Sequence, residues 1–296
     1  MDMIIYLICS LGAVSGFITV LLNARLIWKI VLKKANRNDD MQLFYYRFLT
    51  DTCFGTFLFC NIVYTILSMN FPEFMVNYNS FIVYSALPWS HFAACRSAIA
   101  LSISFERFIA AYFPILYRTT RSKIPNWLIF LLAISFGFSE EIWLFKFCDY
   151  KLDIPSNCKV FGCAVNSCFY SFWTIHKSII FFSILVFSIL ISIKLFIWNT
   201  NGQSSNQISK ANRLALLDTF VVLLFDFLPS FCGTMWPTAP VFSFDVVGPY
   251  NSVLKIIGCA IESIVVSRLL VLRKDENSVS IQNVAVRKAS SRYSKT

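Results

Sequence analysis

Seven apolar segments, each long enough to cross a bilayer as a helix, restrict the fold of this chain more than any other feature. They lie near 4–28, 43–68, 81–113, 126–147, 174–198, 213–237 and 248–272. A transmembrane helix needs about 20 apolar residues, whereas a strand of a membrane barrel needs about 10 residues of alternating character. The sequence therefore predicts an all-α membrane protein, in which residues 1–272 form a bundle of seven transmembrane helices.

The composition agrees with a chain that faces lipid. Hydrophobic residues make up 57% of the sequence and charged residues only 14%, against about a quarter charged residues in soluble domains. The first apolar segment lacks a basic leader and exceeds a signal-peptide core, which favours a retained helix. The tail, 273–296, is basic and rich in serine, and we expect it to be disordered.

Lysine and arginine predict the orientation. If the N-terminus is outside, most of the 26 basic residues fall in the inner loops, their flanks and the tail, as expected for cytoplasmic segments. Arg47 is then a flank of the first inner loop. The outer segments then hold four basic residues, which are Lys146, Lys151, Lys159 and Lys177. The net charge of +10 is thus split among short loops, which does not indicate a nucleic-acid surface. The N-terminus is predicted outside and the C-terminus inside.

The ten cysteines divide into two groups. Six lie in apolar segments and are expected to pack as small hydrophobic residues. Four lie in one segment between the fourth and fifth helices, namely Cys148, Cys158, Cys163 and Cys168. In an extracellular segment they would form one or two disulfides, and the sequence leaves their pairing open.

A charged motif ends the third apolar segment. Glu106-Arg107-Phe108 is followed by Pro114, seven residues beyond the arginine. A charged pair within a membrane helix is costly unless it has a function or reaches the interface. An ordinary interfacial ion pair explains the two charges, but it does not explain the proline or the position at the end of the third of seven helices.

This block is similar to the signature at the inner end of helix three in rhodopsin-like receptors. Within that superfamily the chain resembles the nematode serpentine chemoreceptors, class BC most closely, through residues 40–51 and 106–114. The resemblance implies a G-protein-coupled chemosensory receptor that binds a small extracellular molecule. In that family the acid holds the arginine in the inactive state, and the arginine meets a heterotrimeric G protein in the active state. The expected location is the plasma membrane, in the cilium of a chemosensory neuron.

The sequence departs from the superfamily pattern at three places. No cysteine lies near Ile82, where the usual disulfide would begin, and the seventh segment has Glu262-Ser263 in the region of the Asn-Pro-x-x-Tyr switch. The sixth segment keeps the kink proline, Pro229, and an aromatic residue, Phe227, but not the tryptophan. An outward swing of helix six about Pro229 remains the expected motion.

Five ionisable residues lie well inside the apolar segments, namely Asp51, Arg96, Asp226, Lys255 and Glu262. At about 1.5 Å per residue, Asp51, Arg96 and Glu262 lie at similar depth, roughly 15–17 Å above the inner edge. Because an unpaired charge there costs several kcal/mol, we expect Arg96 to bridge Asp51 and Glu262. Arg47 is a competing partner of Asp51, four residues away. Both a static ion pair and a switch remain open.

Lys255 leaves two further interpretations open. It lies about one residue from the place of the retinal-linking lysine of opsins, or it pairs with Asp226 or Glu262. We expect no cofactor, no metal site and no catalytic residue. The aromatic side chains expected to line a ligand pocket in the outer bundle are Trp89, Phe92, Phe227 and Tyr250, although ordinary packing is the competing explanation.

Two features outside the bundle core complete the hypothesis. Basic residues precede serines at 287–292, a pattern typical either of kinase and arrestin regulation or of a segment that lies on anionic lipid. The alternatives to a G-protein-coupled receptor are a seven-helix ligand-gated channel and a transporter. No inverted repeat supports the transporter, and the distribution of basic residues disfavours a channel with its N-terminus inside. No hydrolase motif is present, so an enzyme is not expected.

Overall fold

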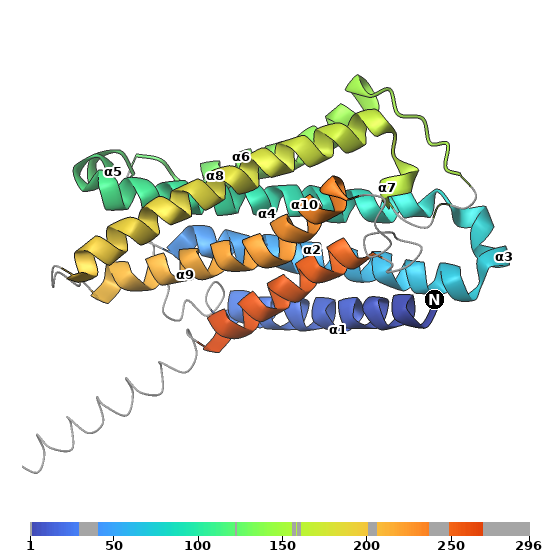
Figure 1. Cartoon of the computed structure of the whole chain (residues 1–296), viewed down its shortest axis with the longest axis horizontal. Coiled ribbons are helices and arrows are strands. Elements are labelled where there is room, and N and C mark those ends of the chain that lie inside the picture. Colours follow the sequence, from blue (N-terminus) through green and yellow to red (C-terminus); the bar gives the residue numbers. More distant parts are fainter. Residues whose placement is uncertain are drawn as a thin grey trace, which may run out of the picture.

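The described residues form one bundle of long helices whose axes follow a common direction (Figure 1). The computed structural model describes residues 2–29, 41–121, 123–155, 158, 161–200, 206–236 and 249–268. These residues contain helices, turns and loops but no strand. The all-α class is therefore confirmed, whereas the predicted tail, 273–296, lies outside the described residues.

Seven helical units run along the bundle. They are α1 (Asp2–Ile27), α2 (Gln42–Asn70), α4 (Phe81–Tyr112), α6 (Asn126–Ile142) with its π-helical continuation η4 (Trp143–Phe147), α8 (Ser167–Thr200), α9 (Asn206–Val222) with its continuation α10 (Leu228–Met235), and a last helix over 250–268. All of these units except α4 contain a segment long and apolar enough to cross a membrane. The short helix α5 (Pro114–Arg121) lies at one end of the bundle and α3 (Pro72–Met75) at the other (Figure 1). Following the predicted orientation, we call these the inner and outer ends.

Helix α4 differs from the other six units because protein surrounds much of it. It packs against α2, α6, α8 and α9, and its residues at many positions from Ile82 to Ala111 are buried. A helix shielded from lipid in this way can carry polar groups that a lipid-facing helix could not. This position explains how α4 accommodates Pro88, Arg96 and Arg107.

The buried apolar side chains form an outer core and an inner core, with charges between them, and a smaller third core made of Ala100, Ile180, Phe181, Ile184 and Val222. On α4, the outer core includes Ala93 and the inner core includes Ile99, and the buried Arg96 lies between the two. On α2, Phe48 belongs to the inner core and Phe54 to the outer core. Each core supplies the burial that stabilises a helical bundle, and the layer between them holds the ionisable groups.

Helix six is interrupted shortly before its proline. The α-helix α9 passes into a π-helical turn, η5 (Leu223–Phe227), and then into α10, where Pro229 lies in the first turn. Proline has no N–H to donate and its ring clashes with the preceding turn, and single π turns often occur at functional sites. The turn gives this helix a local cause for bending beside Pro229.

The loop before α8 folds over the outer end and carries two disulfides. Cys148 is joined to Cys168 and Cys158 to Cys163, which resolves the pairing that the sequence left open. Phe161, in the short helix α7 (Phe161–Ala164), is buried with the outer core. The Cys148–Cys168 bridge reaches the first turn of α8, the Cys158–Cys163 bridge lies before it, and Cys95 of α4 is a free buried thiol.

Helix α8 begins earlier than the sequence indicated. Its first residue is Ser167, not a residue near 174, because Asn166 supplies a side-chain acceptor, 3.0 Å from the backbone N–H of Phe169. An asparagine at this position is a common helix start. The extra turns place His176 and Lys177 inside the helix rather than at its edge.

Candidate functional site

A layer of seven ionisable side chains crosses the middle of the bundle. Each of these side chains is almost fully buried. The layer contains Arg47 and Asp51 of α2, Arg96 of α4, Asp218 of α9, Asp226 of η5, and Lys255 and Glu262 of the last helix. We call this set the mid-bundle cluster. It joins helices two, three, six and seven; the sequence placed charges of helices two, three and seven at comparable depth.

Arg96 bridges two carboxylates from different helices. Its Nε donates to Oδ1 of Asp51 at 2.7 Å, and its Nη2 donates to Oε2 of Glu262 at 3.2 Å. Its Nη1 also lies 3.6 Å from Oδ2 of Asp226. The structure therefore brings together Asp51, Arg96 and Glu262, which the sequence predicted to lie at similar depth. It adds Asp226 of helix six as a third carboxylate.

Arg47 forms a second bridge, which the sequence analysis missed. Its side chain is fully buried, its Nη1 donates to Oδ2 of Asp218 at 2.6 Å, and its Nη2 donates to Oε2 of Glu262 at 3.1 Å. The Nε of Arg47 is 4.0 Å from Asp51, so the expected competition for Asp51 is the weakest of its contacts. Arg47 is a core residue and not a flank of the first inner loop.

Lys255 completes the cluster through Asp226. Its Nζ lies 2.6 Å from Oδ1 of that aspartate, which corresponds to the paired alternative for this lysine. The cluster thus contains three cationic groups and four carboxyl groups. If all seven groups are ionised, the layer carries one excess negative charge. Removing a cation increases this excess, whereas removing a carboxylate leaves the charges balanced.

A second buried polar group lies in the outer half, between α4, α6 and α8. Glu140 of α6 accepts a hydrogen bond from Ser90 at 2.7 Å and lies 3.1 Å from Nε2 of His176 and 3.8 Å from Nζ of Lys177. Trp173 donates to Ser90 at 3.0 Å. Sequence reasoning singled out none of these as a polar cluster, because the early start of α8 was not apparent.

The two histidines contact different glutamate side chains. His176 faces Glu140, whereas Nδ1 of His91 lies 3.4 Å from Oε1 of Glu141. Among the described residues, no group of three or more metal-ligating side chains could hold a metal ion.

The four aromatic residues expected in a ligand pocket occupy separate places. Trp89 is buried, with its ring 6.4 Å from Phe54 and 6.0 Å from Phe161 of the outer loop. The ring of Phe92 lies 5.6 Å from Phe57 and 5.2 Å from His91, and the ring of Phe227 lies 6.1 Å from Phe181 and 5.5 Å from Phe231. Tyr250 is half-buried at the start of the last helix. The structure does not gather these four around one cavity.

Glu106 is the centre of a polar cluster at the inner end of α4. Its carboxylate lies 3.6 Å from Nη2 of Arg107 and 3.3 Å from Nε of Arg121, and it accepts a hydrogen bond from the Tyr117 hydroxyl at 2.8 Å. Burial, together with the nearby Glu106 carboxylate, raises the pKa of Tyr117 to about 12. The phenol therefore stays protonated and remains a donor. We call Glu106, Arg107, Tyr117 and Arg121 the inner-edge cluster.

The local sequence explains how this cluster forms. The helix α4 ends at Tyr112, and Pro114 begins α5, because proline fits the first turn of a helix but cannot continue the preceding one. The resulting bend turns Tyr117 and Arg121 back toward Glu106. The ring of Phe108 packs against Tyr112 at 4.9 Å and Phe187 at 5.3 Å, which secures the end of α4 against α8.

Comparison with protein-family models agrees with this geometry. A search of the curated proteins finds no match. The family model for the serpentine type seven-transmembrane GPCR chemoreceptor Srbc matches residues 1–274, which include every helix described above. The chain therefore belongs to the Srbc family of serpentine chemoreceptors, and it is a multi-pass membrane protein and a seven-transmembrane chemosensory receptor.

Proposed function

We propose that this receptor binds a small extracellular molecule between the outer halves of its helices and activates a heterotrimeric G protein through Glu106, Arg107 and Phe108. The observation that carries the proposal is the inner-edge cluster. Arg107 is paired with Glu106 at the inner end of the most enclosed helix, where a cytoplasmic partner would meet it.

The arrangement of helix six supports an activation step. Asp218 ties α9 to α2 through Arg47, and Asp226 ties η5 to the last helix through Lys255. A swing about Pro229 requires these ion pairs to rearrange as the inner half of helix six moves away from Arg107. A ligand can shift this balance only by binding one arrangement more tightly than the other.

A buried group in the outer core supports a ligand site near Trp89. The indole N–H of Trp89 is buried and has no hydrogen-bond partner among the described residues, and Phe161 of the outer loop covers its ring. A buried donor without an acceptor costs about 1–3 kcal/mol. A small molecule with a hydrogen-bond acceptor that displaced Phe161 would satisfy this donor.

The experiment is a calcium-release screen in cells that carry the receptor and a promiscuous G protein. Volatile and water-soluble small molecules are applied to the parent chain, to Arg107→Ala and to Arg25→Ala, an exposed arginine at the inner end of α1 that serves as the matched control. A response that disappears in Arg107→Ala and persists in Arg25→Ala, at equal surface level, supports the proposal. A response that survives Arg107→Ala, with current but no G-protein requirement, contradicts it and favours a ligand-gated channel or transporter.

The proposal also covers the location of the receptor and the termination of its signalling. We expect the receptor in the ciliary plasma membrane of a chemosensory neuron, which imaging of a tagged chain tests directly. Kinase and arrestin would act at serines within 287–292, a segment outside the described residues. A retinal-bound form receives no support, because Lys255 is engaged with Asp226 at 2.6 Å.

A further inference from the structure

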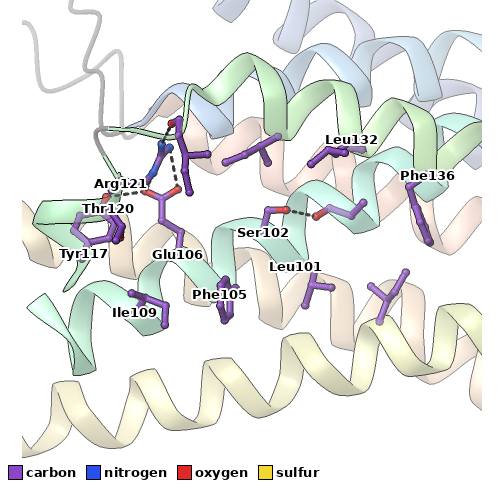
Figure 2. Close-up of a pocket in the computed structure, with 15 residues that line it drawn as sticks. Leu101, Ser102, Phe105, Glu106, Ile109, Tyr117, Thr120, Arg121, Leu132 and Phe136 are labelled. Atoms are coloured by element: carbon purple, nitrogen blue, oxygen red, sulfur yellow. Dashed lines mark hydrogen bonds and ion pairs between the residues drawn. The ribbon is translucent and has the colours of Figure 1, made fainter.

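A pocket of about 460 Å³ opens on the side of the bundle between α4, α5 and α6, with one contribution from α8. Figure 2 shows it as a trough with a polar end and an apolar end. Its apolar walls include Leu101, Phe105 and Ile109 of α4, Leu132 and Phe136 of α6, and Ile180 of α8. It lies on the inner half of the membrane, far from the outer aromatic residues of the proposed ligand site.

The apolar part of the pocket faces the bilayer. Phe105 is 48% exposed and Leu132 is 62% exposed, although both belong to helices that cross the membrane in this receptor. Their exposed surface is therefore in contact with lipid, since water is absent at that depth. A molecule that fills the trough would enter from the membrane and not from the cytosol.

The polar end of the pocket is the inner-edge cluster itself. Arg121 lies 3.3 Å from Glu106, donates to the carbonyl of Ile124 at 2.7 Å and contacts Asn126. Its side chain is 20% exposed, and Nη1 carries a second N–H beyond the one that it donates to Ile124. Tyr117 and Thr120 line the same end (Figure 2).

The charge around this end is positive. Arg118 lies three residues before Arg121 on the same face of α5, and Lys123 follows the helix, and both are exposed. Glu106 is the one carboxylate among the residues that line the pocket, and it already contacts Arg107, Tyr117 and Arg121. Basic side chains at the inner surface of a membrane attract anionic head groups.

We propose that this pocket binds an anionic phospholipid of the inner leaflet. One acyl chain lies along the apolar walls, and the phosphate accepts hydrogen bonds from Arg121, with Arg118 and Lys123 supplying further positive charge. The guanidinium suits a phosphate because its N–H groups form a planar fork that matches two oxygens. An apolar trough and an arginine at its interfacial end thus recognise the two parts of one lipid.

Binding there would act on the signalling residue. A phosphate that draws Arg121 away removes one of the two cations beside Glu106, which strengthens the remaining contact of Glu106 with Arg107 at 3.6 Å. The lipid therefore holds Arg107 in its paired state and lowers the response to an agonist. This regulatory part rests on the proposed function, whereas the binding part does not.

The binding test uses the purified full-length receptor in nanodiscs of phosphatidylcholine with increasing phosphatidylserine, with bound lipid counted by native mass spectrometry. We expect saturable retention of phosphatidylserine, weakened at least about tenfold by Arg121→Gln, since one charge-assisted hydrogen bond is worth that factor. Ser102→Phe should also weaken retention by filling the trough, because Ser102 lines it and its hydroxyl donates to the carbonyl of Ala98 on the same helix. Arg25→Gln is the matched control, with the same loss of charge at an exposed site on α1.

Several results would contradict selective binding of an anionic lipid in this pocket. Equal retention in all variants would mean unspecific surrounding lipid, and an equal loss in Arg25→Gln would mean general surface charge. Phosphatidylcholine that binds as tightly and is displaced by Ser102→Phe would mean an apolar site without selection for charge. Melting curves confirm that each variant is folded, and Ser102→Leu replaces Ser102→Phe if the larger side chain prevents folding.

The regulatory test measures receptor-stimulated nucleotide exchange on a G protein in the same nanodiscs. Phosphatidylserine should reduce exchange by the parent receptor but not by Arg121→Gln. Selective binding with unchanged exchange would overturn the regulatory part alone. Absence of exchange in every bilayer, with selective lipid binding intact, would instead contradict the proposed function and leave the lipid site supported.

Discussion

The mid-bundle cluster and the inner-edge cluster are both built from arginines and carboxylates, yet their surroundings differ. Arg47 and Arg96 are 0% and 3% exposed and each contacts carboxylates on other helices. Arg107 is 9% exposed and lies 3.6 Å from the carboxylate of Glu106, its neighbour in sequence. An ion pair between helices ties them together, whereas a pair within one helix can open without separating any. The comparison assigns stability to the first cluster and signalling to the second.

The largest expected effect comes from removing a mid-bundle guanidinium. Arg47→Gln leaves Asp218 without its cation and Glu262 with one fewer, and breaking a buried pair in this way costs about 3–5 kcal/mol. Surface expression should fall to a small fraction of that of the parent chain, as measured by labelling an extracellular tag. Arg25→Gln, on the exposed end of α1, should express normally. Normal expression of Arg47→Gln would show that the cluster does not hold α9 to α2.

Removing a mid-bundle carboxylate should cost less. The cluster has four carboxyl groups for three cations, so Asp218→Asn leaves the charges balanced and keeps one acceptor for Arg47. We expect a loss of about 1–2 kcal/mol, seen as intermediate expression and an intermediate melting temperature. A defect as large as that of Arg47→Gln would contradict the excess negative charge of the mid-bundle cluster. It would indicate that a proton or cation bound in the cluster already neutralises that charge.

Arg107→Ala should separate signalling from stability. Because Glu106 also contacts Tyr117 and Arg121, its carboxylate keeps two donors, and we expect the fold to lose about 1 kcal/mol. Surface level should match that of the parent chain while the G-protein response is abolished. A parallel loss of surface level and response would place Arg107 with the structural residues.

The smallest effect is expected at Tyr117. Tyr117→Phe removes one hydrogen bond to Glu106, worth about 1 kcal/mol, and should change the agonist concentration for half response by no more than about fivefold. The raised pKa of Tyr117, about 12, means that the hydrogen bond is fully present below the ordinary tyrosine value, about 10, and is lost only above 12. The difference between variant and parent should therefore be constant from pH 6 to 9, in receptor response measured across that range. A difference that varies within the range would show another titrating group.

The sequence predicts some members of the mid-bundle cluster and misses others. Arg96, Asp51 and Glu262 could be joined because each lies about eleven residues from an inner edge, and helical rise converts that spacing into depth. Asp218 was missed because helix six was predicted to begin near 213, whereas α9 begins at Asn206. Asp218 thus lies well inside the helix and not at its margin.

Arg47 and the outer loop show two further limits. A basic residue near the start of a helix usually extends its side chain to the interface, so Arg47 was placed in a loop flank. The signal that could have corrected this was Asp51, four residues on and on the same helix face. The disulfides depend on how the loop folds back over Trp89, which cysteine spacing alone does not encode.

The most direct test compares the melting temperatures of purified Arg47→Gln and Arg107→Gln in one detergent. Each substitution removes one guanidinium and leaves an amide of similar polarity. The account predicts that Arg47→Gln melts roughly 5–15 °C below the parent receptor, while Arg107→Gln melts within about 2 °C of it. Equal shifts for the two variants, or a larger one for Arg107→Gln, would contradict the division between a structural and a signalling cluster.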